Sequence, residues 1–381
     1  AAATAAAAAV PESLVNPRAY FQRYLTLFAP FYGNDERTTL IKEVVPNEVW
    51  ALEQNLCIGP LETPLRCVVV KLAGSGQLWV HAPLAPTVEF FTLVESLDAP
   101  VGHIVVPTYA LEHKVFARDA AERWPEADIW VAPGQFAFPI EVPLSKVFGR
   151  EVAGVLGTAA DAGGTGRSPP WLDEIDCEVL KAGKFAVAFK AVTIREAAFF
   201  HRASKTLVVT DAVARIPYEV PPLQSPEKLL LVSKRSTADP MPEDTPEARL
   251  AGWKKMCLLI NYFFPEHEEM VADKFGVVEW TPGWEDNFDR LAGRLLVPPV
   301  VRSLLYSQDP ASVREWVDTI TAKWDFERVI PAHWEGPIDT NPEQFRAAFT
   351  FLEDPGADPF PEPDLRRGLQ PIADLVITNK R

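Results

Sequence analysis

Between residues 66 and 133, short apolar runs alternate with segments whose apolar residues have helical spacing. Residues 87–97 carry Val88, Phe91, Val94 and Leu97 at helical intervals, and a second helix is predicted from about residue 114 to 124. The apolar runs of strand length are residues 66–72, 77–82, 102–107 and 128–133, with the turn Gly74-Ser75-Gly76 after the first. Such alternation predicts an α/β fold in which helices cover a sheet.

The same kind of pattern continues toward the C-terminus. Residues 194–212 predict a β-hairpin that turns at 203–205, and residues 326–334 predict a short strand that runs out into a loop. Asp309 followed by Pro310 is typical of a helix start, with Asp as the N-cap. The inward stripe expected of this helix is Val313, Trp316, Val317, Ile320 and Trp324.

Composition divides the rest of the chain. We expect residues 1–18, which are rich in alanine, to be a disordered mature N-terminus, and 19–49 to be an N-terminal extension with a short amphipathic helix at 19–33. The main domain then covers residues 50–352, and residues 353–381 are expected to form a Pro-rich, extended C-terminal arm. Residues 157–170 predict a flexible surface insertion, and residues 240–245 a polar loop.

Charge and motif content exclude several functions. The net charge of −15, from 37 basic and 52 acidic residues, disfavours nucleic acid and anionic membranes as partners. No apolar run reaches the ~20 residues of a transmembrane helix. The four cysteines lack metal-ligand spacing; Cys57 and Cys67 could pair, but free buried thiols are favoured. Neither a GxSxG nucleophile motif nor a complete phosphate-binding loop occurs.

Ionisable residues follow three of the apolar runs. Glu112 and His113 come shortly after the run at 104–106, Asp211 follows 207–209, and His333 follows 329–330. Ligands gather at the carboxyl ends of strands in sheet-based α/β folds, so these side chains could converge. Two carboxylates and two histidines would suit a zinc-like or iron-like ion.

Each of these residues also has a structural interpretation. Glu112 and His113 could cap the following helix, Asp211 could close a turn, and His333 could be a packed, hydrogen-bonded histidine. His81 is interpreted as a core histidine, with a supporting role beside a metal ligand as the alternative. His201, next to two phenylalanines, is expected to be structural.

The order of these fragments resembles the metallo-β-lactamase superfamily, which implies an αββα sandwich and a two-metal site. Against the HxHxDH motif of that superfamily this chain reads Thr108-Tyr109-Ala110-Leu111-Glu112-His113, so the first two histidines are replaced. The resemblance matches Asp211 to the bridging aspartate and His333 to the last histidine. It therefore implies that half of a binuclear site is kept and that the half with three histidines is lost.

A closer resemblance is carried by "LWVHAPLAPT", "VPTYALEHKVF", "WVAPGQFAFP", "LVVTDAV" and "VIPAHWEGPI". These segments resemble an uncharacterised family of plants, algae and cyanobacteria, a domain of unknown function, over roughly residues 50–352. Plant and algal members resemble plastid proteins, which implies a chloroplast location.

Two hypotheses on function remain open. Loss of ligands favours a degenerate metal site in a non-catalytic binding or assembly factor, whose partner would contact the N-terminal segment, the apolar stretch from Gly252 to Phe264, or the C-terminal arm. For the stretch from Gly252 to Phe264, a buried core position is favoured over a docking surface. The second hypothesis is a mononuclear Zn, Fe or Mn hydrolase, or a relative using iron for redox chemistry, that binds its ion through Glu112, His113, Asp211 and His333. If these four side chains face one solvent-connected cavity, the metal site is favoured. If the carboxylates instead bond to backbone amides or to an arginine, the non-catalytic protein without metal is favoured.

Overall fold

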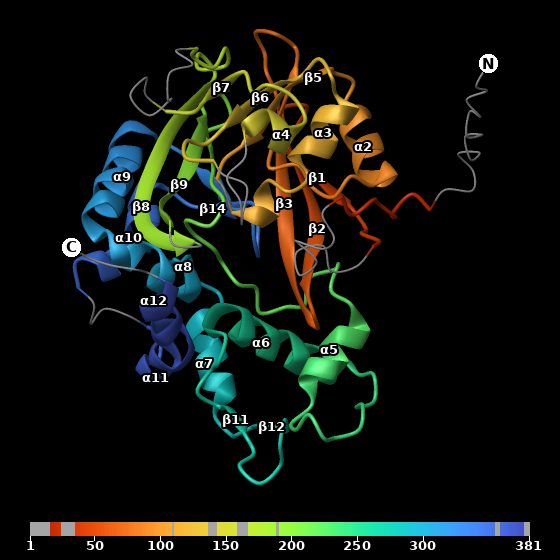
Figure 1. The fold of residues 1–381 in the computed structure, drawn as a ribbon, viewed down its shortest axis with the longest axis vertical. Helices are drawn as coiled ribbons and strands as arrows, with labels where there is room; N and C mark the ends of the chain where they lie inside the picture. The colour runs from red at the N-terminus through yellow and green to blue at the C-terminus, as the bar shows by residue number, and fades with distance from the viewer. Residues whose placement is uncertain are drawn as a thin grey trace.

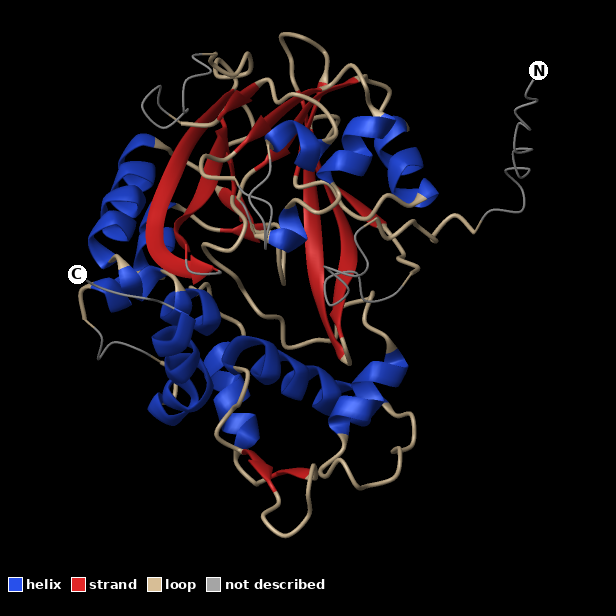
Figure 2. Ribbon diagram, viewed as in Figure 1, coloured by secondary structure: helices blue, strands red, loops and turns tan. Residues whose placement is uncertain are grey.

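The computed structural model describes residues 16–23, 35–108, 110–135, 143–157, 167–187, 190–354 and 359–376. In this part of the chain, two large sheets face each other and helices cover their outer sides (Figures 1 and 2). A further group of helices and a two-stranded sheet lie at one end of the sandwich (Figure 1). The αββα sandwich expected for this chain is confirmed.

The first sheet has the strand order β1-β2-β3-β4-β5-β6-β7. Strands β1 to β4 pair antiparallel, and β4 to β7 pair parallel through helical connections. The strands are β1 (Leu40–Val45), β2 (Val49–Ile58), β3 (Leu61–Lys71), β4 (Leu78–His81), β5 (Val101–Val106), β6 (Asp128–Val131) and β7 (Gly154–Val155). The four strands predicted between residues 66 and 133 are confirmed as β3 to β6, and β3 begins earlier than the pattern indicated.

The second sheet has the order β14-β13-β10-β9-β8. Its strands are β8 (Ile175–Val187), β9 (Lys190–His201), β10 (Thr206–Val208), β13 (Arg328–Ile330) and β14 (Ile338–Asp339). The predicted hairpin at 203–205 is confirmed, because β9 pairs antiparallel with β10 across this turn. Strand β13 lies parallel to β10, which brings the ends of two strands distant in sequence together.

Apolar side chains fill the space between the sheets. Trp79 and Trp130 from the first sheet pack with Trp171 and with Phe199 from the second, and all four are buried. Trp79 meets Phe199 edge-on at a ring-centroid distance of 5.0 Å, a geometry that aromatic quadrupoles favour. Complete burial of each such side chain contributes roughly 1.5–3 kcal/mol or more, so this layer fixes how the sheets face each other.

Helices cover both outer faces of the sandwich. On the first sheet these are α2 (Val88–Glu95), α3 (Ala117–Arg123) and α4 (Leu144–Phe148), and on the second α9 (Pro310–Lys323) and α10 (Pro342–Ala347). Helix α9 begins as predicted, with the Asp309 carboxylate accepting the Ser312 N–H. Its stripe from Val313 to Ile320 is buried against the sheet, as expected.

The stripe predicted for the helix at 87–97 is partly wrong. Thr87 caps α2 by accepting the Phe90 N–H, and Phe90 and Val94 face the core. Val88 instead has 48% of its surface exposed. Positions four apart lie on one face of a helix, and in this short helix the pair that begins at Phe90 is the one turned to the sheet.

A helical layer closes one end of the sandwich. It comprises α5 (Pro226–Ser233), α6 (Pro246–Tyr262), α7 (Trp284–Leu291), α8 (Pro299–Leu304) and the small sheet of β11 (Glu268–Met270) and β12 (Val278–Trp280). Gly252 lets α6 approach α5, since a Cβ there would lie 1.9 Å from the Leu229 oxygen. The stretch from Gly252 to Phe264 largely forms α6, and its buried Trp253, Met256 and Leu258 belong to this layer's core. The favoured interpretation of a core position is therefore confirmed for most of that stretch, and only Phe263 and Phe264 at its end are exposed.

The C-terminal segment is not an extended arm where the structure describes it. Residues 359–376 form α11 (Glu362–Asp364), the π-helical turn Leu365–Leu369 and α12 (Gln370–Val376). Asp364 is fully buried, and Phe360 and Leu369 join the core of the helical layer. The prediction of an extended arm rested on proline content, but Pro361 and Pro363 lie at the start of α11 and Pro371 in the first turn of α12, where proline is tolerated.

Residues before the sandwich are also better integrated than expected. The structure has no helix at 19–23, where Ala19 instead forms a bridge with Glu36, and β1 already belongs to the first sheet. The rest of the helix expected at 19–33, most of the alanine-rich start, residues 158–166 of the predicted insertion and the ends of the C-terminal arm lie outside the described residues. The polar loop at 240–245 is present.

All four cysteines are free, which confirms the interpretation of unpaired thiols and excludes a bond between Cys57 and Cys67. No helix in the described ranges combines the length and the apolar content that crossing a membrane requires.

Candidate functional site

Three loops at one edge of the sandwich carry the candidate residues. The turn Leu111–His113 follows β5, Asp211 follows β10, and His333 follows β13. Isolated bridges between Leu65 and His333 and between Thr108 and Glu196 join the two sheets there. The convergence expected from the strand ends is thus present, because β10 and β13 run parallel side by side and β5 ends opposite them.

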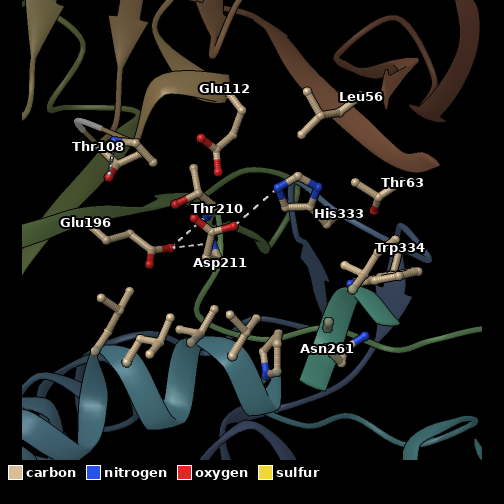
Figure 3. A pocket seen from close by; sticks show the side chains of 18 of the residues that line it. Leu56, Thr63, Thr108, Glu112, Glu196, Thr210, Asp211, Asn261, His333 and Trp334 are labelled. Atoms are coloured by element: carbon tan, nitrogen blue, oxygen red, sulfur yellow. Dashed lines mark hydrogen bonds and ion pairs between the residues drawn. The ribbon is translucent and has the colours of Figure 1, made fainter. Parts of the chain in front are cut away.

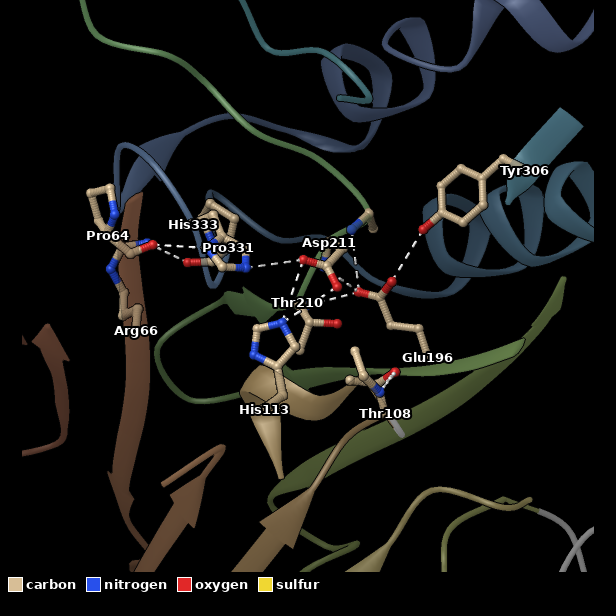
Figure 4. A network of polar contacts seen from close by, with 12 residues as sticks. Pro64, Arg66, Thr108, His113, Glu196, Thr210, Asp211, Tyr306, Pro331 and His333 are labelled. Carbon is tan, nitrogen blue, oxygen red and sulfur yellow. Dashed lines mark hydrogen bonds and ion pairs between the residues drawn. The ribbon is translucent and has the colours of Figure 1, made fainter. Parts of the chain in front are cut away.

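Asp211 lies between the two histidines (Figure 4). Its Oδ1 is 3.4 Å from His113 Nε2 and also 3.4 Å from His333 Nε2. The imidazole rings are 5.2 Å apart between centroids. Donor atoms of Glu112, His113 and His333 all lie within 4.8 Å of one another. The structure therefore brings all four candidate residues together.

The site is mostly buried but remains connected to a cavity. His113 is fully buried, whereas 15% of the His333 side chain and 19% of the Asp211 side chain are exposed. Glu112 points into the same space (Figure 3) and makes no hydrogen bond with any described residue. The Asp211 carboxylate contacts the two histidines and, within the described ranges, neither a backbone amide nor an arginine. No side chain caps the turn Leu111–His113, so the capping and turn-closing interpretations are not supported.

A backbone carbonyl fixes the protonation pattern of His333. Its Nδ1 lies 2.8 Å from the Pro64 oxygen, which only accepts hydrogen bonds, so Nδ1 carries the proton. Burial, reinforced by the nearby charge of His113, lowers the pKa of His333 despite the opposing effect of Asp211. The neutral ring then directs the lone pair of Nε2 at the Asp211 carboxylate. Two electron-rich atoms 3.4 Å apart repel each other unless a cation or a proton lies beside them.

The close contacts in the site also shift the pKa values of His113 and Asp211. Burial by itself would lower the pKa of His113, but the charge and hydrogen bond of Asp211 outweigh it and raise that pKa. Burial by itself would raise the pKa of Asp211, but His113 and His333 hold it below its usual value. An anionic Asp211 beside two imidazoles is a site that attracts positive charge.

The donor set fits a divalent ion. Bonds of about 2.0–2.2 Å at tetrahedral angles put neighbouring ligand atoms about 3.4 Å apart, which is the separation of the Asp211 oxygen from each histidine Nε2. The hydrogen bond from His333 Nδ1 to a carbonyl is the usual support of a metal-ligating histidine. His113, Asp211 and His333 would hold such an ion, and Glu112 has a carboxylate oxygen within 4.8 Å of a ring nitrogen of each histidine.

Thr108 and Ala110 are the residues that the sequence resemblance aligns with the first two histidines of the HxHxDH motif. Both line the cavity. Thr108 accepts the Ala110 N–H through its hydroxyl, and its carbonyl accepts from Gln135. These short side chains line the same cavity as Glu112.

Sequence reasoning missed Glu196, which holds the Asp211 loop in place. This carboxylate on β9 is buried, and its Oε1 accepts the N–H groups of residues 210, 211 and 212 (Figure 4). Tyr306 donates its hydroxyl to Oε2 at 3.1 Å. Burial and then the charge of Asp211 raise the pKa of Glu196 to about 7. The available signal was an acidic residue directly before the apolar strand end Ala197–Phe200.

Arg66 was missed for the same reason, because its partners are distant in sequence. Its side chain is 1% exposed and donates to the carbonyls of Pro331 and Trp334, on either side of His333. Glu53 balances its charge at 2.7 Å. Arg66 thereby fixes the loop that presents His333.

The remaining histidines of interest are structural. His81 is buried and stacks on Trp79, and burial, with the charge of His113, lowers its pKa to about 3, so it stays neutral in the core. His201 is buried, and its Nδ1 contacts the Ser204 hydroxyl at 2.7 Å in the hairpin turn. Both observations agree with the core interpretations of these residues.

A cavity of about 650 Å³ opens beside the site (Figure 3). It lies between the sandwich and the helical layer, with Leu56 from β2, Ile260 from α6 and Val301 from α8 in its wall. The site residues Glu112, Asp211 and His333 lie along one part of it. The arrangement can therefore admit a ligand much larger than water.

Solved structures similar to this chain include metallo-β-lactamases. The metallo-beta-lactamase from Pontibacter korlensis is 12% identical, with 83% of this chain and 100% of that chain covered and a TM-score of 0.35. The FIM-1 enzyme from Pseudomonas aeruginosa in its mono-zinc form is 11% identical, over 83% and 96%, with a TM-score of 0.36. The Flv1 flavodiiron core from Synechocystis sp. PCC6803 is 7% identical, over 83% and 61%, with a TM-score of 0.40. Because these TM-scores are low, the αββα sandwich is assigned from the sheet topology described above and not from these similarities.

Among curated proteins, none matches this chain. The family described as "Domain of unknown function (DUF4336)" matches residues 46–351, close to the range expected from the sequence motifs. This match covers most of the chain and includes all four candidate ligands. The chain therefore belongs to the domain of unknown function family DUF4336.

Proposed function

We propose that this protein is a metal-dependent hydrolase with one divalent ion held by Glu112, His113, Asp211 and His333. The observation that carries the proposal is the His333 Nε2 lone pair, directed by Pro64 at the Asp211 carboxylate beside an open cavity. A divalent ion, like a protonated His113 imidazole, would offset the repulsion between these two atoms. The sequence favoured a non-catalytic factor because histidines are lost, whereas the geometry of the site favours the hydrolase.

The chain's own residues have distinct roles in this proposal. Asp211 stays ionised because two imidazoles lower its pKa, and it orients both rings. Glu112 faces the cavity, and its carboxylate would complete the ligand set beside the two histidines. A divalent ion bound there would supply the Lewis acidity that activates water for hydrolysis. The apolar wall of the cavity limits access of other water molecules.

The donor set also bears on metal identity. Two carboxylates and two imidazoles form a harder, more anionic set than three imidazoles, so iron or manganese fits as well as zinc. The chloroplast location and a protein partner remain predictions from sequence. Of the surfaces expected to bind a partner, most of the stretch from Gly252 to Phe264 is buried in α6 and does not serve that purpose.

Elemental analysis of untagged protein purified without chelators tests the proposal. We expect near-stoichiometric zinc, iron or manganese in the wild type and its loss in the double variant His113→Ala, Asp211→Ala. A control double variant, His267→Ala with Asp244→Ala, removes the same groups from the helical layer and should keep the metal. Absence of metal from all three proteins, with no change in Tm on adding these ions, would eliminate the hydrolase and restore the non-catalytic hypothesis.

A further inference from the structure

The cavity beside the site is apolar over most of its wall. Leu56 and Ile58 come from β2, Ile260 from α6, and Val301 and Leu304 from α8. Several of these side chains, including Ile260, Val301 and Leu304, are only half-buried although they are aliphatic. Aliphatic side chains from three elements that leave surface open toward one cavity are typical of a binding site for an apolar molecule.

The carboxylates of the cavity wall lie in one part of it. Glu112, Asp211 and His333 lie there with Thr210, and Glu196 lies beside Asp211, whereas Asn261 on α6 adds a neutral polar group elsewhere in the wall (Figure 3). The cavity therefore has two chemically different regions, one hydrocarbon-like and one able to bind and polarise a polar group.

The charges in the wall exclude an anionic ligand. Three carboxylates line the cavity, from Glu112, Glu196 and Asp211. Among the lining residues that the structure describes, Lys114 and His333 are the only basic ones, and no arginine is present. Phosphate, sulfate and carboxylate groups are usually held by arginine forks or several backbone amides. The cavity therefore favours a ligand without net charge.

We infer that the cavity binds neutral, hydrophobic acyl compounds, namely esters or amides, with the hydrocarbon part against α6 and α8 and the carbonyl group beside Asp211 and His333. This inference rests on the proposed hydrolase function and adds the substrate class. In the reaction, the oxygen of water bonds to the acyl carbon and the bond from that carbon to the ester oxygen or amide nitrogen breaks. The products are a carboxylic acid and an alcohol or amine, which takes up the proton lost by water.

The size of the cavity sets a quantitative expectation. About 650 Å³ lies within the range of roughly 300–1,000 Å³ that small-molecule sites occupy. Each methylene transferred from water to such a wall strengthens binding about threefold to fourfold. Affinity should therefore rise steeply with acyl length until the cavity is filled.

Binding of primary amides to chelator-treated, metal-free protein tests the inference without any catalytic step. We expect isothermal titration to show a Kd that falls about threefold to fourfold per added methylene from butanamide to decanamide. Decanoate, which has the same chain and a negative charge, should bind at least about tenfold more weakly than decanamide. A Kd independent of chain length, or tighter binding of decanoate, would overturn the inference.

Two variants locate the binding. Leu304→Trp fills the cavity from α8 and should weaken decanamide binding at least about tenfold. Leu231→Trp makes the same change on α5, at a side chain that is 44% exposed and does not line the cavity, and should bind as the wild type does. Circular dichroism shows whether both variants are folded. Unchanged binding in a folded Leu304→Trp variant would contradict the inference.

Metal-loaded protein separates the failure of this inference from that of the hydrolase. If decanamide binds but no p-nitrophenyl ester is hydrolysed, the hydrolase proposal fails and the ligand class stands. If p-nitrophenyl acetate is hydrolysed as fast as the decanoyl ester and decanamide does not bind, the hydrolase stands and the ligand class is wrong.

Discussion

Replacing Glu196 by alanine removes the single acceptor of three successive backbone N–H groups. These groups, from residues 210 to 212, form the loop that carries Asp211, and Tyr306 loses its acceptor as well. Glu196 is 5% exposed and Tyr306 is 1% exposed, so the donors are left in a nearly dry environment. We therefore expect the loop to lose both stability and its fixed position.

The magnitude follows from the number of groups left without a partner. A buried polar group that loses its partner costs about 1–3 kcal/mol, but water from the neighbouring cavity can reach some of these donors. We expect Glu196→Ala to lower the free energy of unfolding by about 3–5 kcal/mol. Glu196→Gln keeps an oxygen for the backbone and removes the like charge beside Asp211, so it should cost about 1 kcal/mol or less.

Urea unfolding followed by circular dichroism measures these differences through the midpoint and the slope. The matched control is Glu327→Ala, which removes a carboxylate that is 62% exposed and pairs with Lys205 at the surface. Such an exposed pair is worth about 0–1 kcal/mol. If Glu196→Ala and Glu327→Ala were equally stable, Glu196 would not organise the loop and the argument built on its three hydrogen bonds would be wrong.

Two further predictions concern buried charges elsewhere. Arg66→Met keeps the apolar stem of the side chain but leaves the carbonyls around His333 unpaired. It should lower the free energy of unfolding by about 2–4 kcal/mol and weaken metal binding about tenfold or more, as measured by dialysis against a chelator. The control Arg202→Met, at an exposed arginine, should change neither quantity. Burial raises the pKa of the Asp364 carboxyl in the folded protein, so the carboxyl ionises at lower pH in the unfolded chain than in the folded one. The wild type therefore loses stability as pH rises from about 4 toward neutrality, and Asp364→Asn should become more stable relative to it over that range. Urea titrations at pH 4, 5.5 and 7 check this, and a stability difference that is constant with pH would contradict it.

Local chemistry determined much of the fold from the sequence alone. Strands that form from apolar runs and a helix that starts at Asp-Pro depend mainly on residues close together in the sequence. Strands β3 to β6 and helix α9 therefore form where the pattern predicted them. The rule that ligands gather at strand ends was enough to select Asp211 and His333, because it depends only on where each strand stops. Glu112 and His113 were found in the same way, with the family motif as a second argument.

Only the tertiary structure decided the parts that depend on distant contacts. Arg66 and the carbonyl of Pro331 are 265 residues apart, and Tyr306 and Glu196 are 110 apart, so no local pattern could pair them. Packing likewise buried the C-terminal helices that proline content had indicated as an extended arm. The apolar cavity is lined by residues of β2, α6 and α8, which are distant in sequence. Which of their side chains remain half-exposed there depends on how whole layers pack and not on any one segment.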